Sequence, residues 1–291
     1  MDKPNCPICF SNSLEIKYHG NIRNGKYPNV VEDRRVIKCS ECSIEFLSDY
    51  KMDYDSPGYR ELVDSDHTAD AYYAIHDKDQ YAKLSFIDLS KLRGKKIIDI
   101  GCGCGSFLDL VKGYASETYA IEPAKFYHAD LTAKGHQVFN SVDEILSEHE
   151  NSFDYVVSFS VIEHVEDPVN FMQQASKLLK VGGVLILSTP NAEDVLLKLL
   201  PKEYSAFFYR VVHKWYFNKE SLSFISQKTD MRLFKVIYKH RFGLSNLINW
   251  MDEKKPNSSK ELHLNDSLNN SFKLELEKKG IADYIYLIAT K

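Results

Sequence analysis

The residues best suited to chemistry in this chain form a glycine-rich turn that follows a short apolar stretch, Ile97 to Ile100. The stretch is rich in β-branched residues and predicts a strand buried on both faces. Glycines in such a turn let the backbone approach a ligand closely, and the N-terminus of the helix expected next favours a negative group. The turn and the acid just before it comprise Asp99, Gly101, Cys102, Gly103 and Gly105.

A carboxylate stands where a nucleotide-binding unit needs one. A second apolar stretch, residues 118–121, ends at Glu122. This acid follows the glycines by about 20 residues, the place of a ribose-binding acid in strand–turn–helix units of this kind. The glycine spacing differs from the G-x-G-x-x-G pattern that accommodates the pyrophosphate of a dinucleotide. The turn and Glu122 therefore favour a different nucleoside-containing cofactor, and the alternative is an ordinary strand–turn–helix without a ligand.

Four cysteines form two C-x-x-C pairs near the N-terminus, and the other two cysteines of the chain lie in the glycine turn. Two such pairs can place four thiolates tetrahedrally around one zinc ion, and the 29 residues between the pairs are enough for a β-hairpin. Too few apolar residues are present to fold this segment unaided, which argues against four unligated thiols. We therefore predict a structural Zn²⁺ ion bound by Cys6, Cys9, Cys39 and Cys42.

An ordered series of short motifs follows the glycine turn. Residues 153–168 match the pattern FDxVxxxxVxEHVxDP, and a Thr-Pro-Asn stretch at residues 189–191 follows a further apolar run. With the glycine turn and Glu122, these motifs resemble class I S-adenosylmethionine-dependent methyltransferases of an EHVxDP/TPN subfamily, over about a third of the chain. The resemblance implies an α/β fold with a Rossmann-like seven-stranded sheet, in which the last strand inserts antiparallel between the fifth and sixth.

The resemblance also implies roles for particular residues. The glycine turn would hold the methionine part of S-adenosyl-L-methionine, Glu122 would accept hydrogen bonds from the ribose hydroxyls, and Asp99 would orient the turn or the ammonium group of the cofactor. Three further residues are expected to line the cofactor site: Tyr73, Ser141 and Phe159. Taken singly, Tyr73 fits a packing or surface role better than a role in the site.

An oxygen acceptor would benefit from a general base, and the resemblance places three candidates near the acceptor. His164 follows the fourth expected strand, and His213 and Tyr216 lie in an aromatic stretch after the fifth. Histidine titrates near neutral pH, which suits proton transfer. For His164, a structural or helix-capping role is the alternative.

Composition argues against several classes of protein. A hydrophobic content of 44% and a charged content of 27% are those of a soluble globular protein. No stretch approaches the roughly 18 apolar residues of a membrane span, and the start of the chain lacks the apolar run of a signal peptide, so we expect a cytoplasmic protein. The net charge of −4 and the nearly neutral N-terminal segment argue against nucleic acid as a partner.

The chain is expected to contain three regions. A small zinc-ribbon-like module covers residues 1–52, a helical lid or linker covers residues 53–93, and a methyltransferase domain covers residues 94–291, with an insertion at about 243–282. A length of 291 residues is enough for one large α/β domain with a small addition.

The leading hypothesis is an S-adenosylmethionine-dependent methyltransferase that acts on a small molecule. The resemblance favours a sugar or nucleotide-sugar intermediate of surface glycan, polysaccharide or secondary metabolite biosynthesis. O-methylation is favoured over C- or N-methylation, because the further C-terminal domain typical of sugar C-methyltransferases is not expected here. The alternatives are an rRNA methyltransferase with a zinc module, against which the charge argues, and a non-catalytic cofactor-binding protein, against which the intact glycine turn and Glu122 argue.

Overall fold

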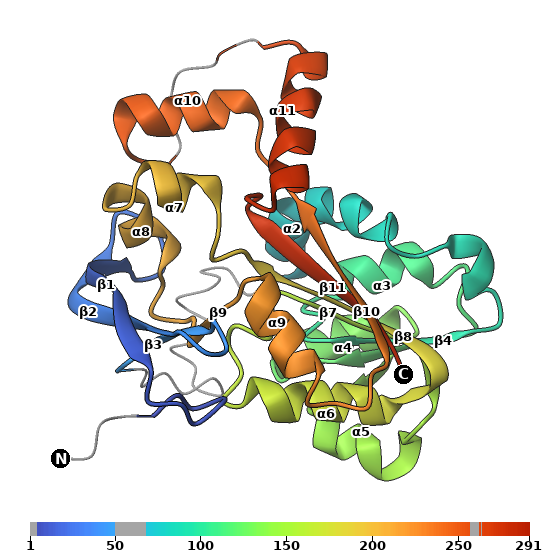
Figure 1. Ribbon diagram of the computed structural model, residues 1–291. Helices are drawn as coiled ribbons and strands as arrows, with labels where there is room; N and C mark the ends of the chain where they lie inside the picture. Colours follow the sequence, from blue (N-terminus) through green and yellow to red (C-terminus); the bar gives the residue numbers. More distant parts are fainter. Residues whose placement is uncertain (1–4, 50–67, 257–261, 263) are drawn as a thin grey trace.

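The computed structural model describes residues 5–49, 68–256, 262 and 264–291 and contains two β-sheets (Figure 1). The larger sheet has the strand order β10-β11-β8-β7-β4-β5-β6. Its strands are β4 (Lys96–Ile100), β5 (Glu117–Ile121), β6 (Gln137–Phe139), β7 (Phe153–Phe159), β8 (Leu179–Pro190), β10 (Leu233–Lys239) and β11 (Tyr284–Thr290). β11 runs antiparallel to both β8 and β10, and the other pairs are parallel. The expected seven-stranded Rossmann-like sheet is confirmed.

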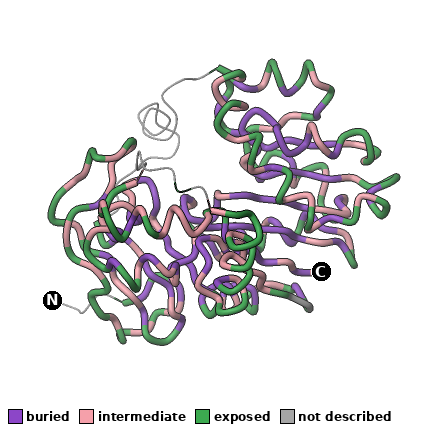
Figure 2. Tube along the Cα trace, turned by 90° about the horizontal axis from the view of Figure 1, so that it is seen from above, coloured by how far each residue is buried: buried purple, intermediate pink, exposed green. Residues whose placement is uncertain are grey.

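Helices cover both faces of this sheet. They are α2 (Ala69–Leu84), η1 (Leu89–Leu92), α3 (Ser106–Val111), η2 (Lys125–Tyr127), α4 (His128–Ala133), α5 (Val142–His149), α6 (Pro168–Leu178) and α9 (Lys219–Ser226). Side chains of α5, α6 and α9 share one core with Ile98 and Ile100 of β4, whereas α2, α3 and α4 share a second core with Ile97. This is the period-two alternation of a strand buried on both faces. Figure 2 shows the buried segments running through the centre of the molecule.

Local sequence explains where the helices after β7 and after β9 (Trp215–Tyr216) begin. Asp167 caps α6 by accepting hydrogen bonds from the backbone N–H groups of Val169 and Asn170 at 2.9 and 3.0 Å. A proline opens that helix, where its missing N–H costs nothing. Asn218 begins α9 in a capping box with Ser221. Both helix starts are thereby fixed beside the ends of the strands that precede them.

The smaller sheet combines the N-terminal segment with a strand from the second half of the chain. Its order is β1 (Leu14–Arg23), β2 (Val30–Cys39), β3 (Glu45–Leu47) and β9 (Trp215–Tyr216), all antiparallel. Three helices share a core with it: α7 (Val195–Leu199), α8 (Glu203–Phe208) and α10 (Leu244–Glu253). Ile22 and Val36 of the sheet pack in that core with Leu196, Tyr204 and Trp250. The N-terminal segment is therefore built into the rest of the chain.

A β-bulge interrupts β8 soon after the strand begins. β8 already pairs with β7 at Leu179, and residues 180–183 bulge out before pairing resumes at Val184. Gly182 has a φ of +79° within this bulge, which a residue with a side chain rarely adopts. The glycine pair therefore serves a β-bulge inside a longer strand.

Three expected regions lie partly outside the described residues. Residues 1–4 and 50–52 of the expected N-terminal module fall outside. Residues 53–67 of the lid fall outside, and its described part is α2 and η1. Residues 257–261 and 263 of the insertion fall outside, and its described part includes α10 and α11 (Asp266–Lys279). Within the described ranges, no helix is long and apolar enough to cross a membrane.

Candidate active site

The glycine turn after β4 has a backbone shape that glycine adopts readily and other residues do not. Gly101, Gly103 and Gly105 have φ angles of +77°, +56° and +80°. A Cβ on Gly101 would lie 2.4 Å from a methyl group of Val161, and a Cβ on Gly103 would lie 2.4 Å from the ring of Tyr72. Conformation and space therefore both require glycine at these positions.

Glu122 at the end of β5 holds this turn in place. The side chain is buried, its Oε2 accepts a hydrogen bond from the Gly103 N–H at 2.9 Å, and its Oε1 accepts one from the Ala124 N–H at 2.8 Å. A carboxylate has about four acceptor positions, so these two bonds are compatible with further donors such as ribose hydroxyls. The group therefore fits the cofactor role expected of it.

Asp99, the last acid of β4, is buried beside the turn. Its Oδ1 has no hydrogen-bond partner among the described residues. Burial raises the pKa of Asp99 to about 7. The positive charge of Lys83 opposes this rise, and the negative charge of Glu122 adds to it. A buried carboxylate oxygen without a donor is the kind of group that a cationic ligand satisfies, so Asp99 fits a ligand with an ammonium group.

Lys83 of α2 reaches the same place, which the sequence analysis missed. Its ammonium nitrogen lies 4.5 Å from the centre of the Phe159 ring and donates a hydrogen bond to Gln80 Oε1 at 2.9 Å. Burial lowers the pKa of Lys83 to about 8, and the charge of Asp99 acts in the opposite direction. A single lysine in a polar helix carries no local signal of burial, because only the packing of α2 over the sheet places it here.

Two neighbouring tyrosines of α2 contact the glycine turn. The Tyr73 hydroxyl donates a hydrogen bond to the backbone oxygen of Cys104 at 3.1 Å, while the Tyr72 hydroxyl lies 3.5 Å from that of Cys102. The ring of Tyr72 also covers Gly103. Tyr73 therefore lies beside the turn, and Tyr72, which was not singled out from the sequence, lies over it.

Ser141 has a local structural role. It is exposed at the start of α5, and its hydroxyl oxygen accepts a hydrogen bond from the Glu144 N–H at 3.3 Å. Its expected contact with the cofactor stays a prediction. Phe159, in contrast, lies at the end of β7 with its ring 5.0 Å from that of Phe107, at the level of the glycine turn.

A second group of buried polar residues lies after β7. Glu163, His164 and His213 each place a carboxylate oxygen or ring nitrogen so that these atoms lie within 4.8 Å of one another. The two imidazole rings are 4.7 Å apart, and His164 Nδ1 lies 2.8 Å from the backbone oxygen of Val212. Two atoms, Glu163 Oε2 and His213 Nδ1, are buried without a hydrogen-bond partner among the described residues. Side chains of these types can move a proton or bind a divalent metal ion.

Backbone pairing brings these residues together from distant parts of the sequence. The N–H groups of Lys214 and Trp215 donate to the backbone oxygen of Glu163 at 2.9 and 3.2 Å. Burial raises the pKa of Glu163 to about 7. Burial also lowers the pKa of His213 well below its usual range, with smaller contributions from His164 and two nearby arginines. The imidazole of His213 is therefore neutral near pH 7, whereas the carboxyl group of Glu163 titrates near pH 7.

Tyr216, the third catalytic candidate, is fully engaged by the backbone. Its hydroxyl donates to the backbone oxygen of Arg210 at 3.0 Å and accepts from the Arg210 N–H at 2.9 Å. Burial raises the pKa of Tyr216 well above its usual value. Its hydroxyl is thus better suited to fixing the bend at Arg210 than to taking a proton.

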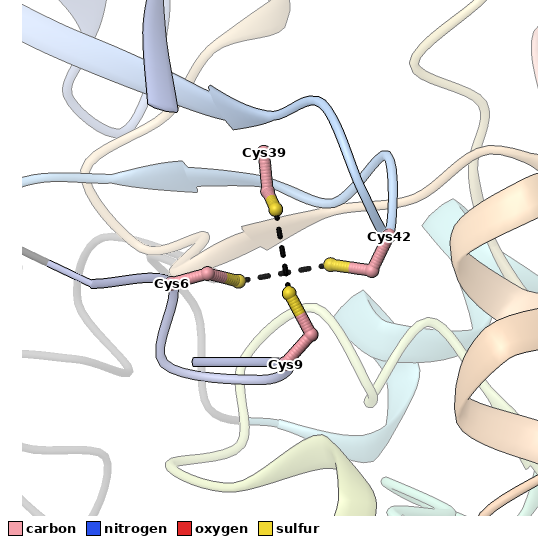
Figure 3. A group of neighbouring side chains, drawn as sticks. All are labelled: Cys6, Cys9, Cys39 and Cys42. Carbon is pink, nitrogen blue, oxygen red and sulfur yellow. Dashed lines mark hydrogen bonds between the residues drawn. The ribbon is translucent and has the colours of Figure 1, made fainter. Parts of the chain in front are cut away.

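The four N-terminal cysteines converge from two turns (Figure 3). The Sγ atoms of Cys6 and Cys42 are 3.6 Å apart, and those of Cys9 and Cys39 are 3.4 Å apart. Thiolates at the usual Zn–S distance in a tetrahedral site are separated by about 3.8 Å. All four cysteines are free thiols, so their arrangement fits a structural zinc ion.

Comparison with known proteins gives consistent results. Residues 69–236, more than half of the chain, match a family model described as a methyltransferase domain. The chain is 32% identical over 133 residues to the ubiquinone biosynthesis O-methyltransferase of Paracidovorax citrulli, covering 42% of this chain and 56% of that protein. The corresponding protein of Haemophilus ducreyi is also 32% identical over 133 residues, covering 38% of this chain and 56% of the relative. The chain thus spans little more than half the length of these relatives.

Solved structures share the fold. A SAM-dependent methyltransferase from Archaeoglobus fulgidus has a TM-score of 0.53 and 17% identity, covering 76% of this chain and 96% of that one. A SAM-dependent methyltransferase from Thermotoga maritima, described as a possible histamine N-methyltransferase, has a TM-score of 0.51 and 21% identity, covering 76% and 93%. The family match covers more than half of the chain, so the chain belongs to the methyltransferase domain family, and it shares the fold of S-adenosylmethionine-dependent methyltransferases of known structure.

Proposed function

We propose that this methyltransferase transfers a methyl group to a hydroxyl of a small molecule, with Glu163, His164 and His213 around the accepting oxygen. The observation that carries the proposal is the buried cluster of these three residues. It follows β7, at the carboxyl-end edge of the sheet that also holds the glycine turn and Glu122. A group that takes a proton suits an oxygen acceptor, and the curated relatives named above are O-methyltransferases.

The residues around the glycine turn would hold the cofactor. S-adenosylmethionine supplies a methyl group on a positively charged sulfur, which an acceptor oxygen takes by in-line displacement. Glu122 would accept hydrogen bonds from the ribose hydroxyls, and the turn itself would hold the methionine part. The orphaned Oδ1 of Asp99 would accept from the ammonium group.

The second cluster would move the proton of the acceptor hydroxyl. Burial keeps His213 neutral, so a ring nitrogen can accept that proton. The resulting imidazolium lies beside the carboxylate of Glu163, which would balance its charge. His164 would donate its Nδ1–H to the Val212 backbone oxygen, which fixes the tautomer and leaves Nε2 as an acceptor.

Two classes of acceptor are supported by different observations. A sugar-like acceptor follows from the sequence resemblance, whereas the relatives named above concern ubiquinone biosynthesis. A transfer assay with tritiated S-adenosylmethionine across nucleotide sugars, dihydroxyphenols and rRNA fragments separates these classes. Labelling of sugars or phenols supports the proposal, and labelling of rRNA alone contradicts it.

Glu122 gives the first prediction. Glu122→Ala removes the acceptor of two ribose hydroxyls, and hydrogen bonds to a charged group contribute about 1.5–3 kcal/mol. S-adenosylhomocysteine binding should weaken by about tenfold or more in calorimetry. Glu148→Ala, at an exposed acid of α5, is the matched control and should bind like the wild type. Unchanged affinity of Glu122→Ala would mean that the ribose lies elsewhere.

His213 gives the second prediction. General-base catalysis contributes about 10²–10⁴-fold, so His213→Asn should lower kcat by that order with the true acceptor. Cofactor affinity should stay nearly constant, because His213 does not belong to the glycine turn. His19→Asn, at an exposed histidine of β1, is the control. A His213→Asn enzyme with wild-type kcat would remove His213 from the mechanism.

Glu163 gives the third prediction, a dependence of stability on pH. Its folded-state pKa of about 7 lies above the usual 4.5, so its contribution to stability is complete below pH 4.5 and is lost as the pH rises through 7. Glu163→Gln cannot ionise and lacks this loss. Urea unfolding should find the variant more stable than the wild type at pH 8, by on the order of 2 kcal/mol, and nearly equal at pH 4.5. A constant difference between these pH values would contradict the raised pKa.

We also propose that the four N-terminal cysteines hold a structural Zn²⁺ ion, on the basis of their sulfur spacing. Elemental analysis of the purified protein should find about one zinc per chain. Cys42→Ser should lose the metal and lower the stability of the N-terminal sheet, whereas Cys104→Ser, outside the cluster, should retain it. Full zinc occupancy in Cys42→Ser would place the metal elsewhere.

A further inference from the structure

Two arginines from distant parts of the chain lie side by side near the proposed acceptor site. Arg23 ends β1, Arg210 follows α8, and the two residues form a parallel β-bridge. The Arg23 N–H donates to the backbone oxygen of Tyr209 at 2.9 Å, and the Val211 N–H donates to that of Arg23 at 3.0 Å. Paired residues of neighbouring strands project to the same side, so the backbone sets the two guanidinium groups close together.

Neither guanidinium group has an anionic partner among the described residues. Both side chains are half-buried, and the Nε atom of each is buried without a hydrogen-bond partner there. The guanidinium of Arg23 stacks on the ring of Phe207, 4.1 Å from its centre. Glu45, a buried acid of β3, instead accepts a hydrogen bond from the Tyr209 hydroxyl at 3.0 Å and forms an ion pair with Lys17. Among the described residues, the two positive charges therefore lie near each other without an ion pair to either of them.

This arrangement is costly and differs from that of Arg241, an arginine with a carboxylate partner. Arg241 forms an ion pair with Asp283, with Nε and Oδ2 2.7 Å apart. For Arg23, burial and the charge of Arg210 together lower the pKa to about 9, although nearby tyrosines oppose the shift. Desolvated like charges lower stability unless an anion joins them. An oxyanion would supply acceptors for both forks of donors at once.

The arginine pair lies beside the residues proposed to act on the acceptor. The His213 N–H donates to the Arg210 backbone oxygen at 3.2 Å. The charge of Arg210 acts on Glu163, and the charges of both arginines act on His213. An anion bound by the pair would therefore be held within reach of the Glu163–His213 cluster, on the side where the N-terminal sheet meets the methyltransferase sheet.

We propose that Arg23 and Arg210 together bind an oxyanion of the acceptor, a phosphate or carboxylate group, so that the substrate of this enzyme is acidic. The inference rests on the proposed function, because it assigns the anion to the molecule that is methylated. It gives the N-terminal segment a direct part in substrate recognition, since Arg23 comes from β1. Planar guanidinium pairs suit the geometry of both oxyanions, and the test distinguishes them.

The test measures anion binding by the full-length protein without the unknown substrate. Inorganic pyrophosphate and malonate serve as the phosphate and carboxylate probes, and calorimetry and thermal unfolding serve as readouts. We expect at least one probe to bind the wild type and raise its melting temperature. Arg23→Gln and Arg210→Gln should each weaken that binding by about tenfold or more, whereas Arg35→Gln, at an exposed arginine of β2, should bind like the wild type.

The free-state stability provides a second readout. Removing one of two uncompensated like charges should raise the melting temperature of Arg23→Gln above that of the wild type when no anion is present. Arg23→Lys keeps the charge but loses the fork, so it should fold like the wild type and still bind the probe more weakly. This variant keeps the test decisive if either glutamine variant fails to fold.

Preference for pyrophosphate would identify a phosphorylated acceptor, and preference for malonate an acid. Absence of binding by both probes, or equal binding by the wild type, Arg23→Lys and the glutamine variants, would overturn the anion site. S-adenosylhomocysteine binding by the same proteins keeps this outcome separate from the proposed function. If the wild type binds S-adenosylhomocysteine but neither anion, only the proposed anion site at the arginine pair is rejected. If the wild type does not bind S-adenosylhomocysteine, the proposed methyl transfer itself is rejected.

Discussion

The hydrogen bond from the backbone N–H of Gly103 to the carboxylate of Glu122 holds the glycine turn in place on the cofactor side of this molecule. Glu122 joins the end of β5 to Gly103 in the turn after β4, at an N···O distance of 2.9 Å. This hydrogen bond helps to offset the conformational entropy that the three glycines of the turn lose on folding. With the turn fixed, Asp99 and the end of β7 face the same small region. One carboxylate thus shapes the turn and offers acceptor positions to a ligand.

The acceptor side depends on a different connection, the segment at residues 209–217. Its backbone pairs with Arg23 of β1, with β3 through Tyr216, and with Glu163 after β7. The indole N–H of Trp215 adds a hydrogen bond to the backbone oxygen of Val165 at 2.8 Å. Residues from three distant stretches of sequence therefore meet around the Glu163–His213 cluster, and the N-terminal sheet forms one side of this region. The N-terminal sheet thus lies beside the residues proposed to act on the acceptor.

The sequence predicts the parts of the structure whose signals are local. The strands around the glycine turn and the position of Glu122 follow from apolar runs, glycine spacing and the family resemblance. The resemblance also gives the antiparallel last strand between the fifth and sixth strands of the large sheet. β9 was not predicted, because a two-residue strand has no periodicity and forms only by pairing with β3. The proximity of Arg23 and Arg210 has no sequence signal either, since nearly two hundred residues separate them.

The side chains that lie at the cofactor site also could not all be predicted from local sequence. Helical spacing cannot decide between Tyr72 and Tyr73, and the cover over Gly103 is set by how α2 packs on α3. Lys83 was missed for the same reason. The pKa shifts of Asp99 and Glu163 arise from burial, which becomes visible only when the strands and helices are assembled. Residue type alone could suggest these acids but not their protonation.

The most direct test of the account is calorimetric titration of S-adenosylmethionine into the wild type, Gly103→Ala and Gly113→Ala. A Cβ at Gly103 would meet the Tyr72 ring at 2.4 Å in a backbone with φ of +56°, whereas a Cβ at Gly113 meets nothing within 4 Å. The account predicts one binding site per chain in the wild type, the same affinity in Gly113→Ala, and affinity lowered by at least tenfold in a folded Gly103→Ala. Equal affinities in all three proteins, or no binding by the wild type, would contradict the assignment of the glycine turn as the cofactor site.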